Sequence, residues 1–84
     1  MREPSPQLLV FGRVVRRARR DRDLSQEALA EAAGLGAKHV SEIERANRDP
    51  RVTTVLKLAA ALDMRVGDLF ALYDDQVEAA GDAS

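Results

Sequence analysis

The sequence predicts a small all-α domain of five short helices. Five segments with helical apolar periodicity follow one another and are joined by brief polar links. Leu, Val, Ala and Ile supply most of the apolar residues and there is no Trp, which favours helices packed through aliphatic side chains over an aromatic-rich β structure. With 84 residues, the chain has room for one core at most. We therefore expect residues 8–72 to form the folded domain, with 1–7 as an N-terminal arm and first-helix start, and 73–84 as an extension of the last helix with a frayed tail.

The first two helices are predicted by their capping residues. The segment SPQLLVFGRVVRRARR begins with Ser5 as N-cap, and a proline follows at the first helical position, where its missing N–H costs nothing. Apolar residues recur there at three- and four-residue steps, so this helix should run to about Arg20 with arginines opposite its apolar stripe. A second helix over 26–33 should have Ser25 as N-cap and end at Gly34 in a left-handed conformation.

Three more helices are expected. One spans about 37–45, with Val40 and Ile43 directed inward. The next begins after Thr53 as N-cap, and its composition suggests the central buried helix of the fold. Its expected buried residues are Val55, Leu56, Leu58, Ala59 and Leu62. The last helix begins at about Val66, and the terminal GDAS should fray.

Charge is unevenly distributed along the chain, although the formal net charge is only −1. Residues 13–51 carry ten Lys/Arg against seven Asp/Glu, whereas residues 52–84 carry two against six. Such asymmetry predicts that one end of the protein faces a polyanion. The alternative is that RVVRRARRDR is an ordinary solvated helix face.

Composition argues against several function classes. Without Cys and with a single His, the chain offers neither disulfides nor a convincing zinc site, so no metal or cofactor is expected. No apolar run is long enough to cross a bilayer, and the N-terminal apolar stretch is too short for a secretion signal, so we expect a soluble, cytoplasmic protein without membrane contact. No catalytic Ser/His/Asp set, phosphate-binding glycine loop or carboxylate pair can be identified, and we expect no enzymatic activity.

The stretch SQEALAEAAGLGAKHVSEIER has the spacing of a helix-turn-helix. Counting from Gln26, that unit needs an apolar residue at the fourth place, a small residue at the fifth, where the two helices touch, and a turn glycine at the ninth. Leu29, Ala30 and Gly34 meet these requirements. In such a unit the first helix braces the second, so that the outward face of the second can enter the major groove of DNA.

The block LSQEALAEAAG, with IER and a later proline, resembles the phage repressor and Cro type of DNA-binding domain, the XRE family. The resemblance covers about residues 9–72. It implies a five-helix, lambda-repressor-like fold with the helix-turn-helix at its second and third helices. It also implies a transcriptional regulator, such as a repressor, that binds double-stranded DNA as a homodimer on a two-fold operator.

The resemblance assigns base-reading positions to the third helix. These positions fall on Ala37, Lys38 and Glu42, with His39 and Ser41 beside them. Lys38 can donate to guanine, Glu42 can accept from cytosine N4, and the Ala37 methyl group can touch a thymine methyl group.

Other positions carried over from the family concern phosphates and stability. The expected phosphate contacts are Gln26, Arg45, Asn47 and Arg48. Arg19 and Glu44 fall on positions that form an ion pair between the first and third helices of such domains.

Three positions depart from the family pattern. Ala46 replaces a usual glycine, so the turn is either strained there or taken at Asn47. Arg65 replaces the Ser or Thr that usually caps the fifth helix, and Gly36 replaces a better N-cap of the third.

The fifth helix carries more apolar residues than one contact stripe requires. The predicted homodimer interface consists of Phe70, Leu72, Tyr73 and Val77. The alternative is that these side chains fold back to cap a small core. Acidic residues around them would keep this end of the protein away from DNA.

Two other interpretations remain at the level of the sequence. The same fold can serve as an antitoxin or accessory module that binds a protein partner of unknown identity. A free-standing chain of this size also suits the controller protein of a restriction-modification cluster.

Overall fold

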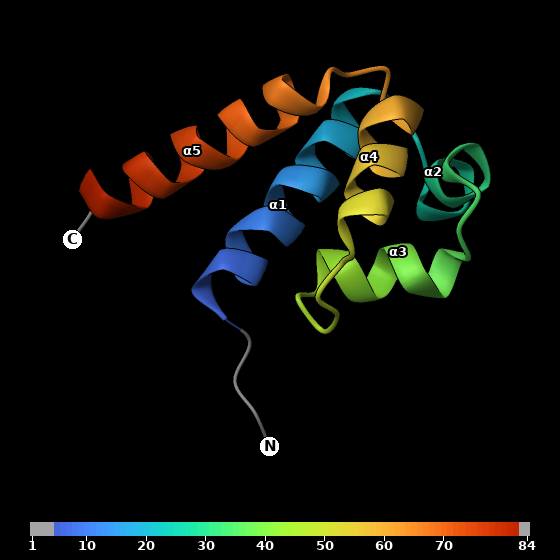
Figure 1. Cartoon of the computed structure of the whole chain (residues 1–84), viewed down its shortest axis with the longest axis horizontal. Coiled ribbons are helices and arrows are strands. Elements are labelled where there is room, and N and C mark those ends of the chain that lie inside the picture. The colour runs from blue at the N-terminus through green and yellow to red at the C-terminus, as the bar shows by residue number, and fades with distance from the viewer. Residues whose placement is uncertain (1–4, 83–84) are drawn as a thin grey trace.

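In a computed structural model the chain forms five α-helices (Figure 1). The structure describes residues 5–82, and side chains from residue 5 to 79. The helices are α1 (Pro6–Asp21), α2 (Gln26–Ala33), α3 (Ala37–Glu44), α4 (Val52–Ala61) and α5 (Val66–Asp82). No strand occurs within residues 5–82. The predicted all-α, five-helix fold is confirmed.

The capping residues set the helix ends where the sequence predicted them. The Ser5 hydroxyl accepts a hydrogen bond from the backbone N–H of Leu8, and the Ser25 hydroxyl accepts one from that of Ala28. Gly34 ends α2 with φ of 71°, a left-handed conformation that glycine adopts without steric cost. The tight turn between α2 and α3 follows from this residue.

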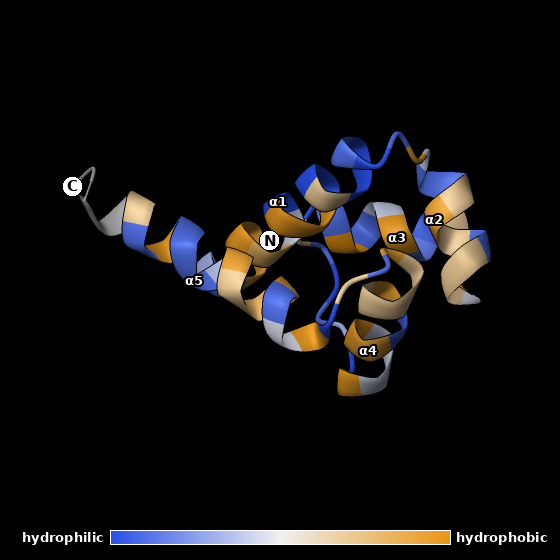
Figure 2. Ribbon diagram, turned by 90° about the horizontal axis from the view of Figure 1, so that it is seen from above, coloured by the Kyte–Doolittle hydropathy of each residue, from blue (hydrophilic) through white to orange (hydrophobic). Residues whose placement is uncertain are grey.

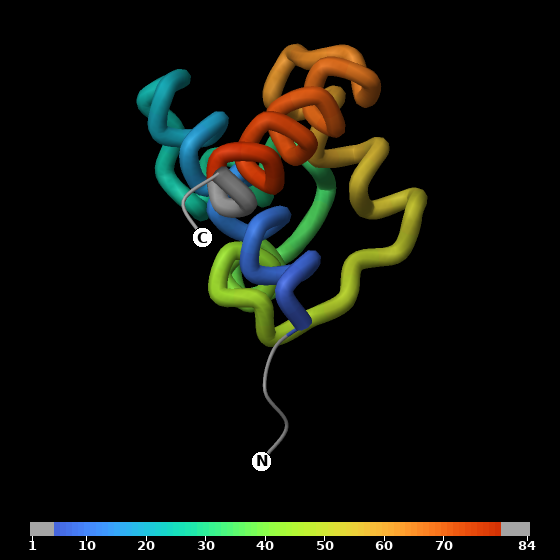
Figure 3. Tube along the Cα trace, turned by 90° about the vertical axis from the view of Figure 1, so that its left-hand side faces the viewer, coloured from blue at the N-terminus to red at the C-terminus, as the bar shows by residue number. Residues whose placement is uncertain are grey.

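Helix α1 lies between α3 and α5, while α4 packs against α2 and α5 (Figures 1 and 3). The apolar sides of the helices face one another, and the outer side of α1 is hydrophilic (Figure 2). The largest fully buried side chains are Leu29, Ile43, Leu58, Leu62, Leu69, Val15 and Val40. All five helices contribute to this one core.

The backbones of α1 and α3 approach closely at Gly12. A Cβ atom on Gly12 would lie 2.6 Å from the backbone oxygen of Glu44 and 2.7 Å from that of Ile43. Real Cβ atoms do not come so near to other heavy atoms, so any larger residue would push the two helices apart. Gly12 therefore fixes where the C-terminal end of α3 lies against α1.

Two predictions for α4 are wrong. The helix begins at Val52 with Arg51 as N-cap, no side chain caps it, and Thr53 lies within its first turn. Leu56 is half exposed and Val52 is largely exposed, so α4 buries one stripe rather than lying at the centre of the fold. Thr54 and Val55 in its first turn are buried, and no side chain caps the helix at this end.

Helix α5 is longer than expected. Its backbone remains helical through Gly81 and Asp82, which were predicted to fray, because no proline or turn glycine interrupts it before that point. The part of α5 beyond residue 72 is the segment that was predicted to extend this helix. Residues 1–4 of the predicted arm and residues 83–84 lie outside the described residues.

The turn after α3 is taken at Ala46. This residue is buried and has φ of 62°, a left-handed conformation that strains a residue with a Cβ atom. The Ala46 N–H donates to the Ile43 carbonyl, and the Asn47 N–H donates to the Glu42 carbonyl at 2.8 Å. Of the two alternatives for this turn, the structure therefore has the strained one.

Candidate nucleic-acid interface

The outer side of α3 carries the predicted base-reading residues. Lys38 is exposed, whereas His39, Ser41 and Glu42 are partly buried. Ala37 is also partly buried and packs against the core, so less of its methyl group is available to a base than the sequence suggested. Lys38 is thus the most accessible member of the set.

The predicted ion pair between Arg19 and Glu44 is present on the inner side of α3. Arg19 Nε lies 2.7 Å from Glu44 Oε2, and Arg19 Nη2 lies 3.0 Å from Glu44 Oε1. Arg19 Nη1 also donates to the Leu24 carbonyl at 2.8 Å. The side chains are only 12% and 2% exposed, respectively. The hydrogen bond to Glu44 outweighs burial and raises the pKa of Arg19, so this guanidinium stays protonated.

Gln26 joins the same cluster. Its Nε2 atom donates to Glu44 Oε1 at 3.1 Å, which links the start of α2 to the end of α3. An amide nitrogen has two hydrogens, so one remains for a phosphate at the N-terminus of α2. The sequence assigned Gln26 to phosphate alone and did not indicate this second contact.

A second ion pair lies on the outer side of α3. Arg48 Nε, in the loop after the helix, is 3.2 Å from Glu42 Oε2. The Arg48 side chain is 46% exposed and that of Glu42 is 19% exposed. Both residues were predicted to contact DNA, but a bond between them was not predicted. Arg45, by contrast, is exposed and donates to the Ser41 carbonyl of its own helix.

The basic residues of 13–51 lie on different parts of the surface and have different partners. Arg19 is paired with Glu44. Arg22 donates to the carbonyls of Ala18 and Leu62 and so links the end of α1 to the end of α4. Four exposed arginines line a shallow hollow of about 400 Å³ on the outside of α1, together with Asp21. These are Arg13, Arg16, Arg17 and Arg20. On α3 and in the loop that follows it, positive charge is carried by Lys38, Arg45, Arg48 and Arg51.

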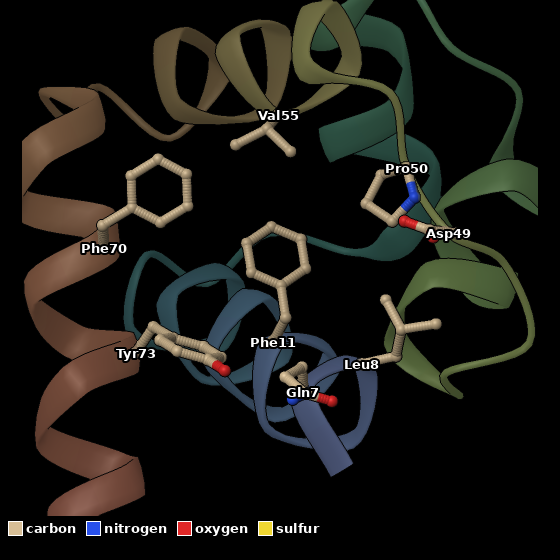
Figure 4. A pocket seen from close by; sticks show the side chains of 8 residues that line it. All are labelled: Gln7, Leu8, Phe11, Asp49, Pro50, Val55, Phe70 and Tyr73. Atoms are coloured by element: carbon tan, nitrogen blue, oxygen red, sulfur yellow. The ribbon is translucent and has the colours of Figure 1, made fainter. Parts of the chain in front are cut away.

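An apolar groove opens between the start of α1, the loop after α3, and helices α4 and α5 (Figure 4). Its volume is about 200 Å³. The lining residues are Gln7, Leu8, Phe11, Asp49, Pro50, Val55, Phe70 and Tyr73. Phe70, on α5, remains 46% exposed although it faces this groove. Tyr73 and Val77 line an adjoining hollow against Pro6, Gln7 and Val10 of α1.

The four predicted interface residues do not share one face of α5. Successive residues of a helix are about 100° apart, so Val77 lies within about 20° of Phe70, whereas Leu72 lies about 160° away. Leu72 lines a different hollow, with Val14 and Arg17 of α1. Tyr73 is partly buried and packs against the core, as the fold-back alternative expected for it.

The described part of the chain offers neither a metal site nor a transmembrane helix. Within residues 5–82 no group of three or more His, Cys, Asp or Glu side chains is arranged to hold a metal ion. None of the helices described there combines the length and apolar character needed to span a bilayer.

Comparison with known proteins places this arrangement in a family. The helix-turn-helix family model HTH_3 matches residues 15–69. The chain is 34% identical over 59 residues to y4dJ of Sinorhizobium fredii, an uncharacterized HTH-type transcriptional regulator, and the match covers 70% of this chain and 77% of that protein.

Solved structures agree with the family match. The restriction-modification controller protein C.AhdI from Aeromonas hydrophila is 38% identical, with a TM-score of 0.76 over 77% of this chain and 98% of that one. The clp gene regulator ClgR from Corynebacterium glutamicum shares the fold at 21% identity, with a TM-score of 0.83 over 96% of this chain and 87% of that one. The resemblance found in the sequence is thereby confirmed, and the chain belongs to the XRE-type helix-turn-helix family.

Proposed function

We propose that this chain, a DNA-binding transcriptional regulator, acts as a homodimer on a two-fold site, with α3 of each copy in the major groove. One observation carries the proposal. The inner side of α3 is fastened to α1 and α2 through Gly12, Arg19 and Gln26, while its outer side makes no packing contact that would occupy Lys38. A rigidly held helix with a free polar face is what reading of base edges requires.

The residue roles follow from position and chemistry. Lys38 donates to guanine O6 and N7, and Glu42 accepts from cytosine N4, with Ala37, His39 and Ser41 beside them. Phosphate contacts come from Gln26, Arg45, Asn47 and Arg48, which lie at the start of α2 and at the end of α3 or just after it. The matched relatives are regulators rather than enzymes, and we propose no catalytic activity.

A binding selection from random duplexes, read by sequencing, tests the reading face. The wild type should enrich a two-fold site. Lys38→Ala should weaken the preference for one base pair in each half-site by about 1–3 kcal/mol. Lys57→Ala is the matched control, because Lys57 is exposed on α4 and should leave the selected sequence unchanged. Absence of any enriched site would favour a protein-interaction module. If Lys38→Ala selects the same sequence as the wild type, the residues that read the bases lie elsewhere.

The proposed dimer uses the Phe70 side of α5. One reading helix covers few base pairs, so two copies with half-sites about 34 Å apart, or a multiple of that distance, give useful specificity. Phe70 and Val77 share a face of α5, and the groove beside Phe70 extends that apolar surface across Val55 and Pro50. Leu72 lies on the opposite side, next to Arg17, and contributes less than its sequence position suggested.

Sedimentation at high micromolar concentration tests the dimer. The wild type should sediment as a dimer, and Phe70→Asp should be monomeric because a carboxylate would be buried in an apolar contact. Leu72→Asp is the control on the other side of the same helix and should dimerise. A monomeric wild type, or the same oligomeric state for the two variants, would show that the Phe70 side of α5 is not the dimer interface.

The similarity to C.AhdI favours a more specific role as the controller of a restriction-modification cluster, because it extends over 98% of that protein. Genes for a restriction endonuclease and a methyltransferase should then adjoin the gene for this chain. The selected DNA site should lie upstream of them. If such genes are absent from the neighbourhood, the chain is still a transcriptional regulator, but its proposed role as a restriction-modification controller is contradicted.

A further inference from the structure

We propose that Arg48 is a positioning residue for sequence recognition, and that it orients the Glu42 carboxylate toward an amino group on a base. This inference rests on the proposed function, since it assumes that α3 reads the major groove. It goes beyond a phosphate contact by Arg48, which would carry no sequence information.

A carboxylate on the DNA-facing side of α3 poses an electrostatic problem, because phosphates repel it. The positive charge of Arg48, next to the Glu42 carboxylate, offsets this repulsion. Arg48 Nε lies 3.2 Å from Glu42 Oε2, and Arg48 forms no other ion pair in the described part of the chain. Arg45, although exposed on the same helix end, bonds a backbone carbonyl instead.

The backbone brings the two residues together. Ala46 takes a left-handed conformation, and the Asn47 N–H then donates to the Glu42 carbonyl at 2.8 Å. The loop therefore folds back onto the residue that Arg48 contacts. The strained turn at Ala46 and the ion pair are consequently parts of one arrangement.

This geometry leaves one oxygen of Glu42 for DNA. Arg48 occupies Oε2, and no hydrogen bond to Oε1 is found within the described residues. A carboxylate oxygen accepts from cytosine N4 in the major groove. The Arg48 guanidinium has five N–H donors and uses Nε here, so its Nη atoms remain for a phosphate. Arg48 can thus hold the DNA backbone and the base-reading carboxylate at once.

Selections from random duplexes with Arg48→Ala, Glu42→Gln and the double variant test the proposal. Arg48→Ala and Glu42→Gln should each weaken the preference at the same base pair by about tenfold. The double variant should weaken that preference little further. Arg48→Lys should keep most of the overall affinity but only part of the preference at that base pair, because an ammonium lacks the planar fork of Arg48. Arg45→Ala is the matched control and should weaken binding to all sequences alike.

The outcomes separate this inference from the proposed function. A wild type that enriches no site removes the proposed function and this inference together. An enriched site that Arg48→Ala binds more weakly, but with the base preference at the Glu42 position unchanged, overturns the positioning role alone. So does a Glu42→Gln variant that alters no base preference.

Discussion

Helix α3 has a glutamate–arginine pair on each of its two sides, and the pairs differ in what surrounds them. On the inner side Glu44 binds Arg19 through two parallel N–H donors, and water reaches little of either side chain. On the outer side Glu42 binds Arg48 through a single nitrogen, and almost half of the Arg48 side chain is exposed. Glu42 and Glu44, only two residues apart in the sequence, therefore form the same kind of ion pair in different surroundings.

The difference shows that burial decides what an ion pair does. Exposed pairs contribute about 0–1 kcal/mol, because water screens them and two long side chains must be ordered. Removing one partner of a buried pair leaves a charge without solvent or partner and costs far more. The inner pair thus holds α3 in place, whereas the outer pair contributes little to stability and, in the proposed complex, contacts DNA while it stays paired.

Breaking the inner pair should have the largest effect. Glu44→Gln or Arg19→Met should each lower the free energy of unfolding by about 3 kcal/mol, since each leaves the other charge buried. For a domain of this size that loss lowers the melting temperature by roughly 10 °C or more. Thermal melts of the two single variants and the double variant measure it. Small, additive losses would show that water screens the pair.

The contribution of Arg19 should not depend on pH in the neutral range. Its pKa is raised in the folded protein, so the stability it supplies is present below the ordinary arginine pKa and is lost only as pH rises through the folded value. The difference in unfolding free energy between the wild type and Arg19→Met should therefore be constant between about pH 6 and 10. A difference that disappears in that window would contradict the assignment.

Gly12→Ala should have the next largest effect, because it acts on the inner side of α3 through sterics alone. The added methyl group would meet two backbone oxygens of α3, and neither can move without moving the helix. We expect a loss of about 1–3 kcal/mol in unfolding free energy. Gly67→Ala is the matched control: nothing lies within 4 Å of a Cβ at Gly67, so that change should be neutral or stabilising. Urea unfolding of both variants measures the contrast.

Arg22 offers an intermediate case. It is exposed and donates to two backbone carbonyls rather than to a carboxylate. Arg22→Gln should cost about 1 kcal/mol, because it removes the hydrogen bonds to those two carbonyls. Arg20→Gln, at an exposed position on the same helix, should change stability by less than about 0.5 kcal/mol. Equal stability of the two variants would show that the Arg22 bonds contribute nothing.

Breaking the outer pair should affect stability least. Glu42→Gln and Arg48→Ala should each change the unfolding free energy by less than about 0.5 kcal/mol, and 1 M salt should remove most of that difference. Thermal melts at low and high salt measure it. A loss as large as that of Glu44→Gln would mean that the outer pair is structural and not available to DNA.

Much of the fold could be predicted because the signals for it are local. Ser5, Ser25 and Gly34 act on backbone groups within one helical turn, and all three have the predicted conformations. Apolar periodicity likewise indicated which side of α1 and α3 is buried. The start of α4 was missed because no capping side chain marks it and Thr53 imitates one.

The candidate site was predicted as a set of positions, and the Arg19–Glu44 pair was the one contact predicted with it. Lys38 is exposed on the expected face, yet Ala37 turns partly to the core, and Gln26 is shared with Glu44. Long polar side chains can reach many partners, so their choice depends on which elements lie nearby. Gly12 carried a signal that the sequence prediction did not use, because a glycine inside a helix pattern often marks a close approach of another backbone.

The sequence by itself determined the five helices, the tight turn at Gly34 and the family, because caps, periodicity and spacing act over a few residues. Only the tertiary structure decided that Ala46 takes the strained turn, that Arg48 returns to Glu42, and that Gln26 bonds Glu44. The physical reason is the same for all three. Each depends on where one element lies against another, and that is fixed when the apolar faces of all five helices close on one core.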